Sequence, residues 1–395
     1  MKALLKLSDV QLIQAQAHMI KKSLDSGFIV LSGQSGLSNQ SEIWFENFIR
    51  QSRWNPWLEI HHFQSTEEHG TLYQLSIEGR ALHTPWCDTL HLRLIDDLWI
   101  TDPEKALDEE ILLGLLTSPY LQKFPNYDEI VSALRVRRLI AQAGQLTSLK
   151  FDTRAVDRPM SHWSYQEELG FTLRKDCSLI EALRLATQPS YSGVEYAFSC
   201  YRASEYVILL GIVEEAKISN PDFYEKLHRQ WEKKAIASGA FHETFLLEHG
   251  SLSEPVPMRH YIPGDRVWFR NPDSISSNVS GYEGSWVIYL GNGLFSNFWA
   301  NLHPFNLEEK CLEIYHWRDG AFQDDAGVWQ MDESLVSEMV RISKSHPLKK
   351  ASILNQMLRY REASGIYFQG GCIDASRESP RLIRPGTCNM VLLDV

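Results

Sequence analysis

The residues from 193 to 213 constrain this chain more than any other stretch, because a turn runs directly into a long helical pattern that opens with a cysteine. Proline, serine and glycine over 189–193 mark the turn. Beyond it, one face of the predicted helix carries four residues at helical spacing, namely Cys200, Ala203, Val207 and Leu210. The pattern therefore places Cys200 in the first turn of a helix.

A cysteine in this position has two interpretations. Unpaired backbone N–H groups and the helix dipole stabilise a thiolate in the first turn, which predicts a lowered pKa for Cys200 and suits a nucleophile. A free cysteine is also a small hydrophobe that packs readily in a core. The helical pattern fits both interpretations, so the neighbouring residues have to distinguish them.

The run Tyr196-Ala197-Phe198-Ser199-Cys200 is one of four collinear segments. A lead-in helix and strand (134–143 with 171–182) precede it, a His-Tyr-x-x-Gly-Asp strand ending in Asn-Pro (260–272) follows it, and Gly-Ser-Trp-Val-Ile-Tyr-Leu-Gly (284–291) comes last. Together they resemble the small protein-glutamine gamma-glutamyltransferases of Bacillus spores, which read Tyr-Ala-Phe-Glu-Cys-Ala-Thr-Ala around the nucleophile. Four segments in order are much harder to obtain by chance than one motif.

The resemblance covers roughly residues 130 to 305 and implies both a fold and a reaction. It implies an α+β protein with a papain-like (NlpC/P60-like) core, in which the Cys200 helix lies on an antiparallel sheet. Cys200 would form a thioester from a glutamine carboxamide or a related acyl donor and pass the acyl group to an amine or to water. It implies no cofactor. We expect protein or small-molecule amine and acyl substrates.

The chain departs from this family at the residues that accept and donate protons during the reaction. The family glutamate of the Gly-Glu-Asn strand is replaced by Ser285, and the carboxylate before the cysteine by Ser199. Serine cannot act as a base near neutral pH. Glu283 lies two residues earlier, on the same face of an extended strand, and is the carboxylate that can substitute. Of the glutamates flanking Cys200, we expect Glu205 to point away from it.

The family histidine is replaced as well, by Asn297 or, with a short insertion, by Asn301. A strand is predicted over 294–300. If it continues, His303 lies on the same face as Asn297 and Asn301, which makes it the first candidate imidazole for Cys200. His260 matches a family histidine and is the second. Asp265, Asn271 and Pro272 also match the family, but a turn and a strand end explain them.

Three units are predicted along the chain: an α+β module over 1–125, the transglutaminase-like domain over 126–307 and a C-terminal extension over 308–395. Neither outer unit resembles the family. In the outer units the pattern predicts a helix over 8–25, a plain turn rather than a phosphate loop at 33–36, a strand over 98–100, and a strand pair at 313–317 and 328–329.

Charge and composition bear on the partners, the cellular compartment and the metal sites expected of the chain. The net charge of −11 argues against nucleic acid as a partner. No apolar run reaches membrane-spanning length, and the start of the chain is too short an apolar stretch for a signal peptide. The six cysteines are scattered without zinc spacing, which favours reduced thiols in a cytoplasm, with export by another route as the alternative. The histidines at 61, 62 and 69 lie beside Glu67 and Glu68, but a strand end and a polar loop explain them better than a metal.

A second hypothesis comes from the same departures. A relative that has lost the family glutamate and histidine can keep the fold as a binding or scaffolding module without activity. Retention of Cys200 and its aromatic lead-in favours the enzyme.

Overall fold

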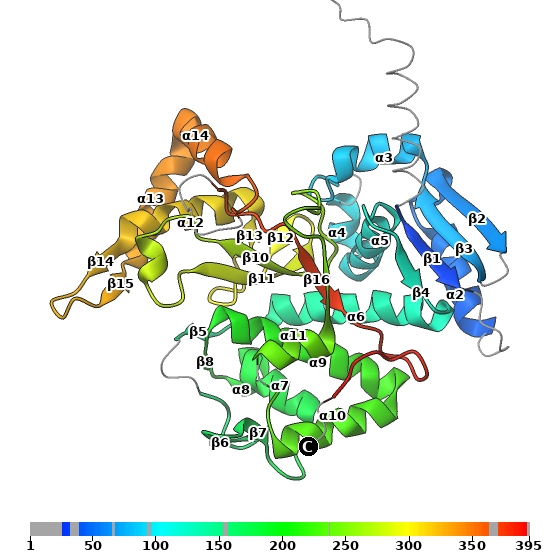
Figure 1. Cartoon of the computed structure of the whole chain (residues 1–395), viewed down its shortest axis with the longest axis horizontal. Helices are drawn as coiled ribbons and strands as arrows, with labels where there is room; N and C mark the ends of the chain where they lie inside the picture. Colours follow the sequence, from blue (N-terminus) through cyan, green and yellow to red (C-terminus); the bar gives the residue numbers. More distant parts are fainter. Residues whose placement is uncertain are drawn as a thin grey trace, which may run out of the picture.

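The computed structural model describes residues 26–31, 39–64, 68–92, 96–152, 157–236, 238–362 and 370–392. The helix predicted over 8–25, the turn at 33–36 and Glu67 of the histidine group lie outside the described residues. Figure 1 shows a mixed α+β molecule, as expected, with the N-terminal sheet and the helices that follow residue 307 at opposite ends.

Two long helices form the centre, α6 (Tyr127–Leu146) and α9 (Cys200–Ser219). They approach closely where Gly211 meets Ile140, since a Cβ at Gly211 would lie 2.5 Å from Ile140 Cγ1. Around them pack the helices α7 (Leu179–Thr187), α10 (Pro221–Lys233) and α11 (Ser238–Phe245), and one hydrophobic core joins these five helices. The chain returns to this core near its end, where Asn220 Nδ2 donates to the Ile383 carbonyl at 2.6 Å.

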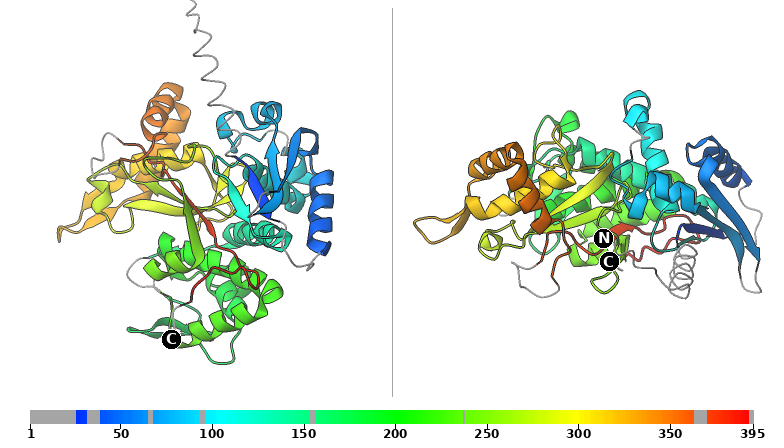
Figure 2. Two further views of the ribbon diagram at one scale, coloured as in Figure 1. Left: turned by 45° about the vertical axis from the view of Figure 1, so that its right-hand side comes forward. Right: turned by 90° about the horizontal axis from the view of Figure 1, so that it is seen from above.

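A six-stranded sheet lies against these helices. Its strands run in the order β13-β12-β11-β10-β16-β9, all antiparallel, with bounds Phe305–Asn306, Leu294–Phe295, Gly284–Gly291, Arg266–Arg270, Arg377–Pro380 and Leu246–His249. Alternate residues of β11 serve two cores: Ile288 packs with α9, and Val287 and Tyr289 pack on the other face. The predicted helix on an antiparallel sheet is therefore present, and Figure 2 shows it from two further sides.

The N-terminal sheet has the order β2-β3-β1-β4, with bounds Leu58–Gln64, His69–Leu75, Phe28–Leu31 and Gln122–Phe124. The helices α2 (Asn39–Gln51) and α5 (Pro103–Leu116) pack on it, and its core continues into α6 and Ile262. The fully buried Glu110 of α5 accepts hydrogen bonds from Tyr289 Oη at 2.5 Å and from the Asn292 N–H at 2.8 Å. The predicted boundary at residue 125 therefore crosses a continuous core.

Beyond the six-stranded sheet, α12 (Leu307–Gly320), α13 (Glu333–Ser345) and α14 (Pro347–Met357) cover its second face. Asn306 and Glu309 form a capping box at the start of α12. A hairpin of β14 (Ala321–Gln323) and β15 (Trp329–Met331) joins α12 to α13. The remaining elements are short: α3 (Ile77–His83), α4 (Asp96–Thr101), α8 (Pro189–Ser192), the pair β5 (Lys150–Phe151) and β8 (Ala197–Phe198), the pair β6 (Trp163–Gln166) and β7 (Gly170–Leu173), and 3-10 turns at 55–57, 85–87 and 276–278.

Two strand predictions are wrong, and a third is too long. Residues 98–100 belong to α4, and 313–317 belong to α12. The strand expected over 294–300 ends at Phe295 and gives way to turns. A short run of apolar and aromatic residues fits one turn of a buried helix or an aromatic loop as well as it fits a strand.

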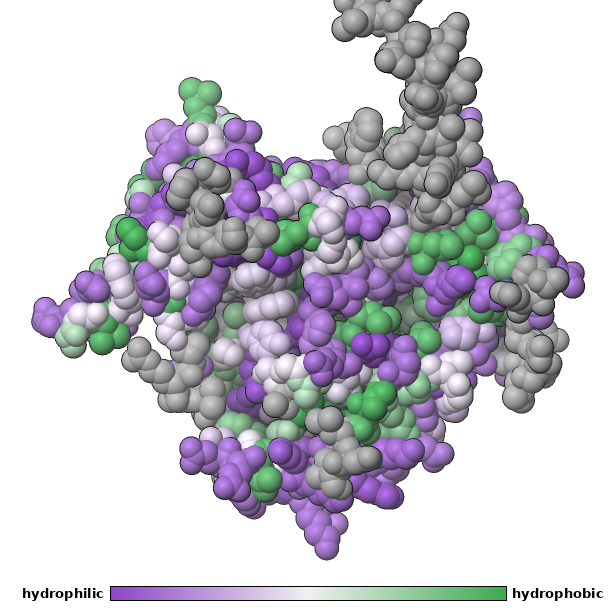
Figure 3. Space-filling view, in the orientation of Figure 1, coloured by the Kyte–Doolittle hydropathy of each residue, from purple (hydrophilic) through white to green (hydrophobic). Residues whose placement is uncertain are grey.

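The outer surface is mostly polar. On the face that Figure 3 shows, the hydrophobic groups are small and separated. The exposed large hydrophobic residues include Ile60 of β2 and Ile77 and Leu82 of α3. Within the described residues, no helix combines the length and hydropathy needed to cross a membrane.

Candidate active site

Cys200 begins α9 as predicted. Ser199 is the N-cap, and its Oγ accepts a hydrogen bond from the Arg202 N–H at 3.3 Å. The residues before it form β8, which pairs with β5 in parallel. The buried Arg158 guanidinium lies 3.3 Å from the centre of the Phe198 ring and donates to the Ala197 carbonyl at 3.1 Å. This packing fixes the direction in which the chain enters the helix.

The start of α9 lies beside β11, because the rings of Tyr201 and Trp286 are 5.2 Å apart, and β12 pairs with only part of one edge of β11. On that edge the Ile288 N–H donates to Ser296 Oγ and the Ile288 carbonyl accepts from the Ser296 N–H, both at 2.9 Å. Trp286 is two residues earlier, so its N–H points to the same edge. The backbone N–H groups of Trp286 and Tyr201 both act to lower the pKa of the Cys200 thiol.

Burial raises the pKa of Cys200, contrary to the lowered pKa predicted from its place on the helix. Although the residue is partly exposed, protein surrounds the sulfur closely enough for this desolvation to dominate. The Trp286 N–H, the Lys310 charge and the Tyr201 N–H lower the pKa, and the Glu283 charge raises it. The helix start has the predicted effect, but burial outweighs it.

Lys310 is the site residue that the sequence did not indicate. It lies on α12, its side chain is only 4% exposed, and its Nζ bonds Glu313 at 3.0 Å. The same Nζ lies 3.9 Å from the centre of the Phe305 ring. Because residues 313–317 were predicted as a strand in an unrelated extension, nothing placed this lysine near Cys200. The spacing of Lys310 and Glu313, one helical turn apart, was the available signal.

Glu283 and Ser285 lie where β11 begins. Glu283 is exposed, and its Oε1 accepts a hydrogen bond from the Gly281 N–H at 3.3 Å. Ser285 is buried and pairs across the sheet with Phe269. The charge of Glu283 raises the pKa of Cys200, and its role as a substitute for the family glutamate remains a prediction.

His303 is exposed in the turn after β12. Its backbone carbonyl accepts a hydrogen bond from Asn297 Nδ2 at 3.0 Å. Because residues 297–303 are not a strand, the periodicity that placed His303 on the face of Asn297 and Asn301 does not apply. A role for its imidazole remains a prediction.

His260 is fully buried, and neither ring nitrogen has a hydrogen-bond partner among the described residues. Burial lowers its pKa to about 3, and the charges of Arg377 and Arg137 add to the effect. The imidazole is therefore held neutral inside the core near pH 7.

The other family matches have structural contacts. Asp265 pairs with the buried Arg137 at 2.7 Å and accepts from the Ile262 N–H at 2.8 Å. Asn271 donates to Ser276 Oγ and to the Tyr282 carbonyl. Glu205 pairs with Arg202 at 2.6 Å rather than with Cys200, and burial raises its pKa to about 7.

A cavity of about 770 Å³ adjoins this end of β11. The residues that line it include the aromatic side chains of Tyr282, Trp299, Phe305 and Trp317 and the carboxylates of Glu309, Glu313 and Glu333. Phe151 connects it to the lead-in strand, because its ring lies 5.1 Å from Trp299 and 5.6 Å from Tyr282. His303 is also among the residues that line the cavity. Acidic and aromatic side chains therefore lie beside the strand pair β5–β8, which leads into Cys200.

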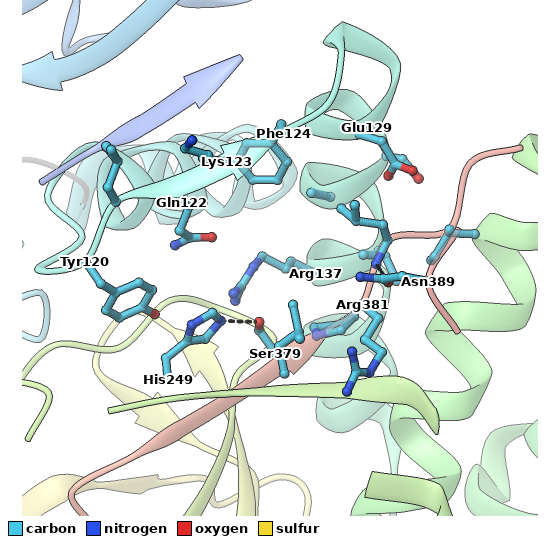
Figure 4. Close-up of a pocket in the computed structure, with 18 residues that line it drawn as sticks. Tyr120, Gln122, Lys123, Phe124, Glu129, Arg137, His249, Ser379, Arg381 and Asn389 are labelled. Carbon is cyan, nitrogen blue, oxygen red and sulfur yellow. Dashed lines mark hydrogen bonds between the residues drawn. The ribbon is translucent and has the colours of Figure 1, made fainter. Parts of the chain in front are cut away.

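A second cavity, of about 250 Å³, lies between β4, α6, β9 and β16, and Cys200 is not among the described residues that line it. Figure 4 shows Gln122 and Arg137 pointing into it and His249 bonded to Ser379. Arg137 is paired with Asp265, and Lys123 at the rim with Glu68. Arg137 thus ties α6 to the segment before β10, and Lys123 ties β4 to the segment before β3.

The described residues contain no cluster of three or more groups suited to a metal ion. His61 lies 3.7 Å from Glu59, and His62 bonds Thr71 at 3.0 Å. These two histidines are consecutive in β2 and point to opposite faces of its sheet.

Comparison with known proteins gives three results. No curated protein is similar enough to count as a relative. A solved transglutaminase from Geobacillus stearothermophilus, without its C-terminal extension, shares 20% identity over 54% of this chain and 98% of that one, with a TM-score of 0.38, too low to carry an argument. The family model of protein-glutamine gamma-glutamyltransferases matches residues 96–364, from α4 past α14 and well beyond the segments that show the resemblance by eye. The chain therefore belongs to the protein-glutamine gamma-glutamyltransferase family.

Proposed function

We propose that Cys200 is the nucleophile of a transglutaminase-type acyl transfer, which forms a thioester from a glutamine carboxamide. The observation that carries the proposal is the place of Cys200 at the start of α9, packed beside β11, where the Trp286 and Tyr201 N–H groups lower the pKa of its thiol. Donors fixed in that position can also bind the oxyanion that develops when the sulfur attacks a carbonyl carbon.

The thiol has to lose its proton before it attacks. Glu283 is the carboxylate that we propose to accept it, and the Lys310 ammonium stabilises the thiolate that remains. The sulfur then bonds to the carboxamide carbon, and the C–N bond breaks. The departing nitrogen takes the proton and leaves as ammonia. An amine or water next attacks the thioester and releases Cys200, giving an amide cross-link or a glutamate.

We place the second substrate in the cavity beside the Cys200 segment. Its aromatic rings suit the carbon chain of an amine substrate. An ammonium ion would share the carboxylates of Glu309 and Glu313 with Lys344 and Lys310. Amine transfer, rather than hydrolysis, then depends on how well the bound amine excludes water from the thioester.

The direct test is incorporation of a fluorescent primary amine into casein by the full chain, with ammonia release measured in parallel. We expect both signals from the wild type and neither from Cys200→Ala. The matched control is Cys177→Ala, which removes a partly exposed thiol outside the site and should leave both signals unchanged.

The alternative, an inactive binding or scaffolding module, is favoured by two observations: burial raises the pKa of Cys200, and Ser285 stands at the family glutamate. A folded wild type that neither releases ammonia nor incorporates amine across a range of acyl donors would support this alternative.

A further inference from the structure

Two cysteines outside the candidate site face each other in the core between the six-stranded sheet and the C-terminal helices. Cys311 lies on α12 and Cys372 follows α14, and both are completely buried. Their sulfurs are 3.3 Å apart and hydrogen-bonded, although 61 positions separate them in sequence. Buried cysteines commonly pack as isolated hydrophobes, so a direct sulfur–sulfur contact across this distance in sequence is unusual.

The backbone around Cys372 holds it in place. Its N–H donates to the Met357 carbonyl at 3.0 Å, and its carbonyl accepts from the Arg270 N–H of β10 at 2.9 Å. Gly371 before it leaves no space for a side chain, since a Cβ there would lie 2.1 Å from the Arg359 carbonyl oxygen. The chain therefore delivers this sulfur to α12 with little freedom to turn away.

We propose that Cys311 and Cys372 are a modification site, at which a disulfide bond forms when the chain folds in contact with an oxidised thiol or a peroxide. The bond requires the sulfurs to approach by about 1.3 Å, within reach of small side-chain rotations. With glutathione disulfide, one cysteine thiolate displaces a glutathione thiol and forms a mixed disulfide. The thiolate of the second cysteine then attacks the first cysteine's sulfur in this mixed disulfide and releases the other glutathione as a thiol. In total, two protein thiols are oxidised and one glutathione disulfide is reduced.

The surroundings make the bond slow to form or break in the folded protein. The hydrogen bond to Cys372, and then burial, raise the pKa of Cys311 well above its usual range, so the attacking thiolate is scarce. The cross-link would tie α12, the helix that carries Lys310, to the segment after α14. Its presence would therefore record the redox conditions under which the chain folded.

The test refolds the full chain from denaturant, once in a glutathione redox buffer and once in excess reductant. Each refolded sample is then freed of small thiols, unfolded again and alkylated, so that buried free thiols also react, and the peptides are mapped. We expect one linked peptide pair, containing Cys311 and Cys372 and lighter by two hydrogens, only from the oxidising sample. The oxidised protein should unfold at a temperature higher by on the order of 5 °C, because the bond closes a long loop.

Two variants and a second oxidant complete the test. Cys372→Ala should leave Cys311 alkylated, whereas Cys177→Ala should keep the linked pair. Native protein that has never been denatured is treated in parallel with hydrogen peroxide, which is reduced to water as the bond forms, and it should gain the cross-link only slowly. The inference is overturned when both cysteines are found alkylated after oxidative refolding, or when either one is found bound to glutathione or to another cysteine.

Discussion

Cys200 and Cys311 are both surrounded by protein, and burial contributes to a raised thiol pKa in each. Their other neighbours differ. Cys200 has two backbone N–H donors, an ammonium and a carboxylate, whereas the leading influence on Cys311 is another thiol. Desolvation is common to both and therefore does not mark a reactive site. What distinguishes Cys200 is the set of groups that oppose desolvation once the proton has left.

The largest expected difference between the two cysteines is in catalysis. Cys200→Ala should reduce amine incorporation by about 1,000-fold or more, because no other thiol replaces the nucleophile. Cys311→Ala should change it by less than about twofold while lowering the melting temperature, since it removes a buried sulfur from a packed core. Equal losses in both variants, measured at matched folded fractions, would break the comparison.

Glu283→Gln should cost about 100-fold in kcat, the usual contribution of a positioned proton acceptor, and flatten the pH–rate profile. The matched substitution is His303→Gln, at an exposed histidine of the same region, which we expect to have a smaller effect. The opposite ranking, with His303 the more sensitive, would restore the imidazole predicted from the sequence and remove Glu283 from the mechanism.

The pH dependence of alkylation tests the raised pKa of Cys200. A thiol reacts as its thiolate, so below the pKa its labelling rate should rise about tenfold for each pH unit between about pH 6 and pH 8. A lowered pKa would instead give a rate that is independent of pH over this range. Cys311 is fully buried and should stay unlabelled throughout, as peptide mapping after an iodoacetamide pulse can establish.

The smallest expected effect concerns Lys310. Lys310→Met should slow labelling of Cys200 at a fixed neutral pH by roughly threefold to tenfold, because the thiolate loses a stabilising charge. Lys310→Arg should retain part of the rate. The matched control is Lys344→Met. The Lys344 ammonium lies on α13 and pairs with Glu309 of α12, the helix that carries Lys310, and its loss should leave the rate unchanged. An unchanged rate in Lys310→Met would show that the backbone donors suffice.

The sequence by itself determined the local features. Ser199, Asp102 and Asn220 cap helices as such residues do, and the period of the apolar residues set the length of α6 and α9. The motif around Cys200 identified the family, because backbone direction and helix start are encoded within a few residues. The strand prediction for the short apolar run 98–100 was wrong, because three residues are too few to distinguish the period of a strand from that of a helix.

Only the tertiary structure decided the chemistry around the sulfur. Trp286, Lys310 and Glu283 are 83 or more positions from Cys200, and the position of β11 beside α9 and the packing of α12 bring their charges and donors to it. The direction of the Cys200 pKa shift likewise depends on groups that are distant in the sequence. A helix start is a local property, whereas desolvation depends on everything that folds around the atom, and that sum cannot be read from neighbouring residues.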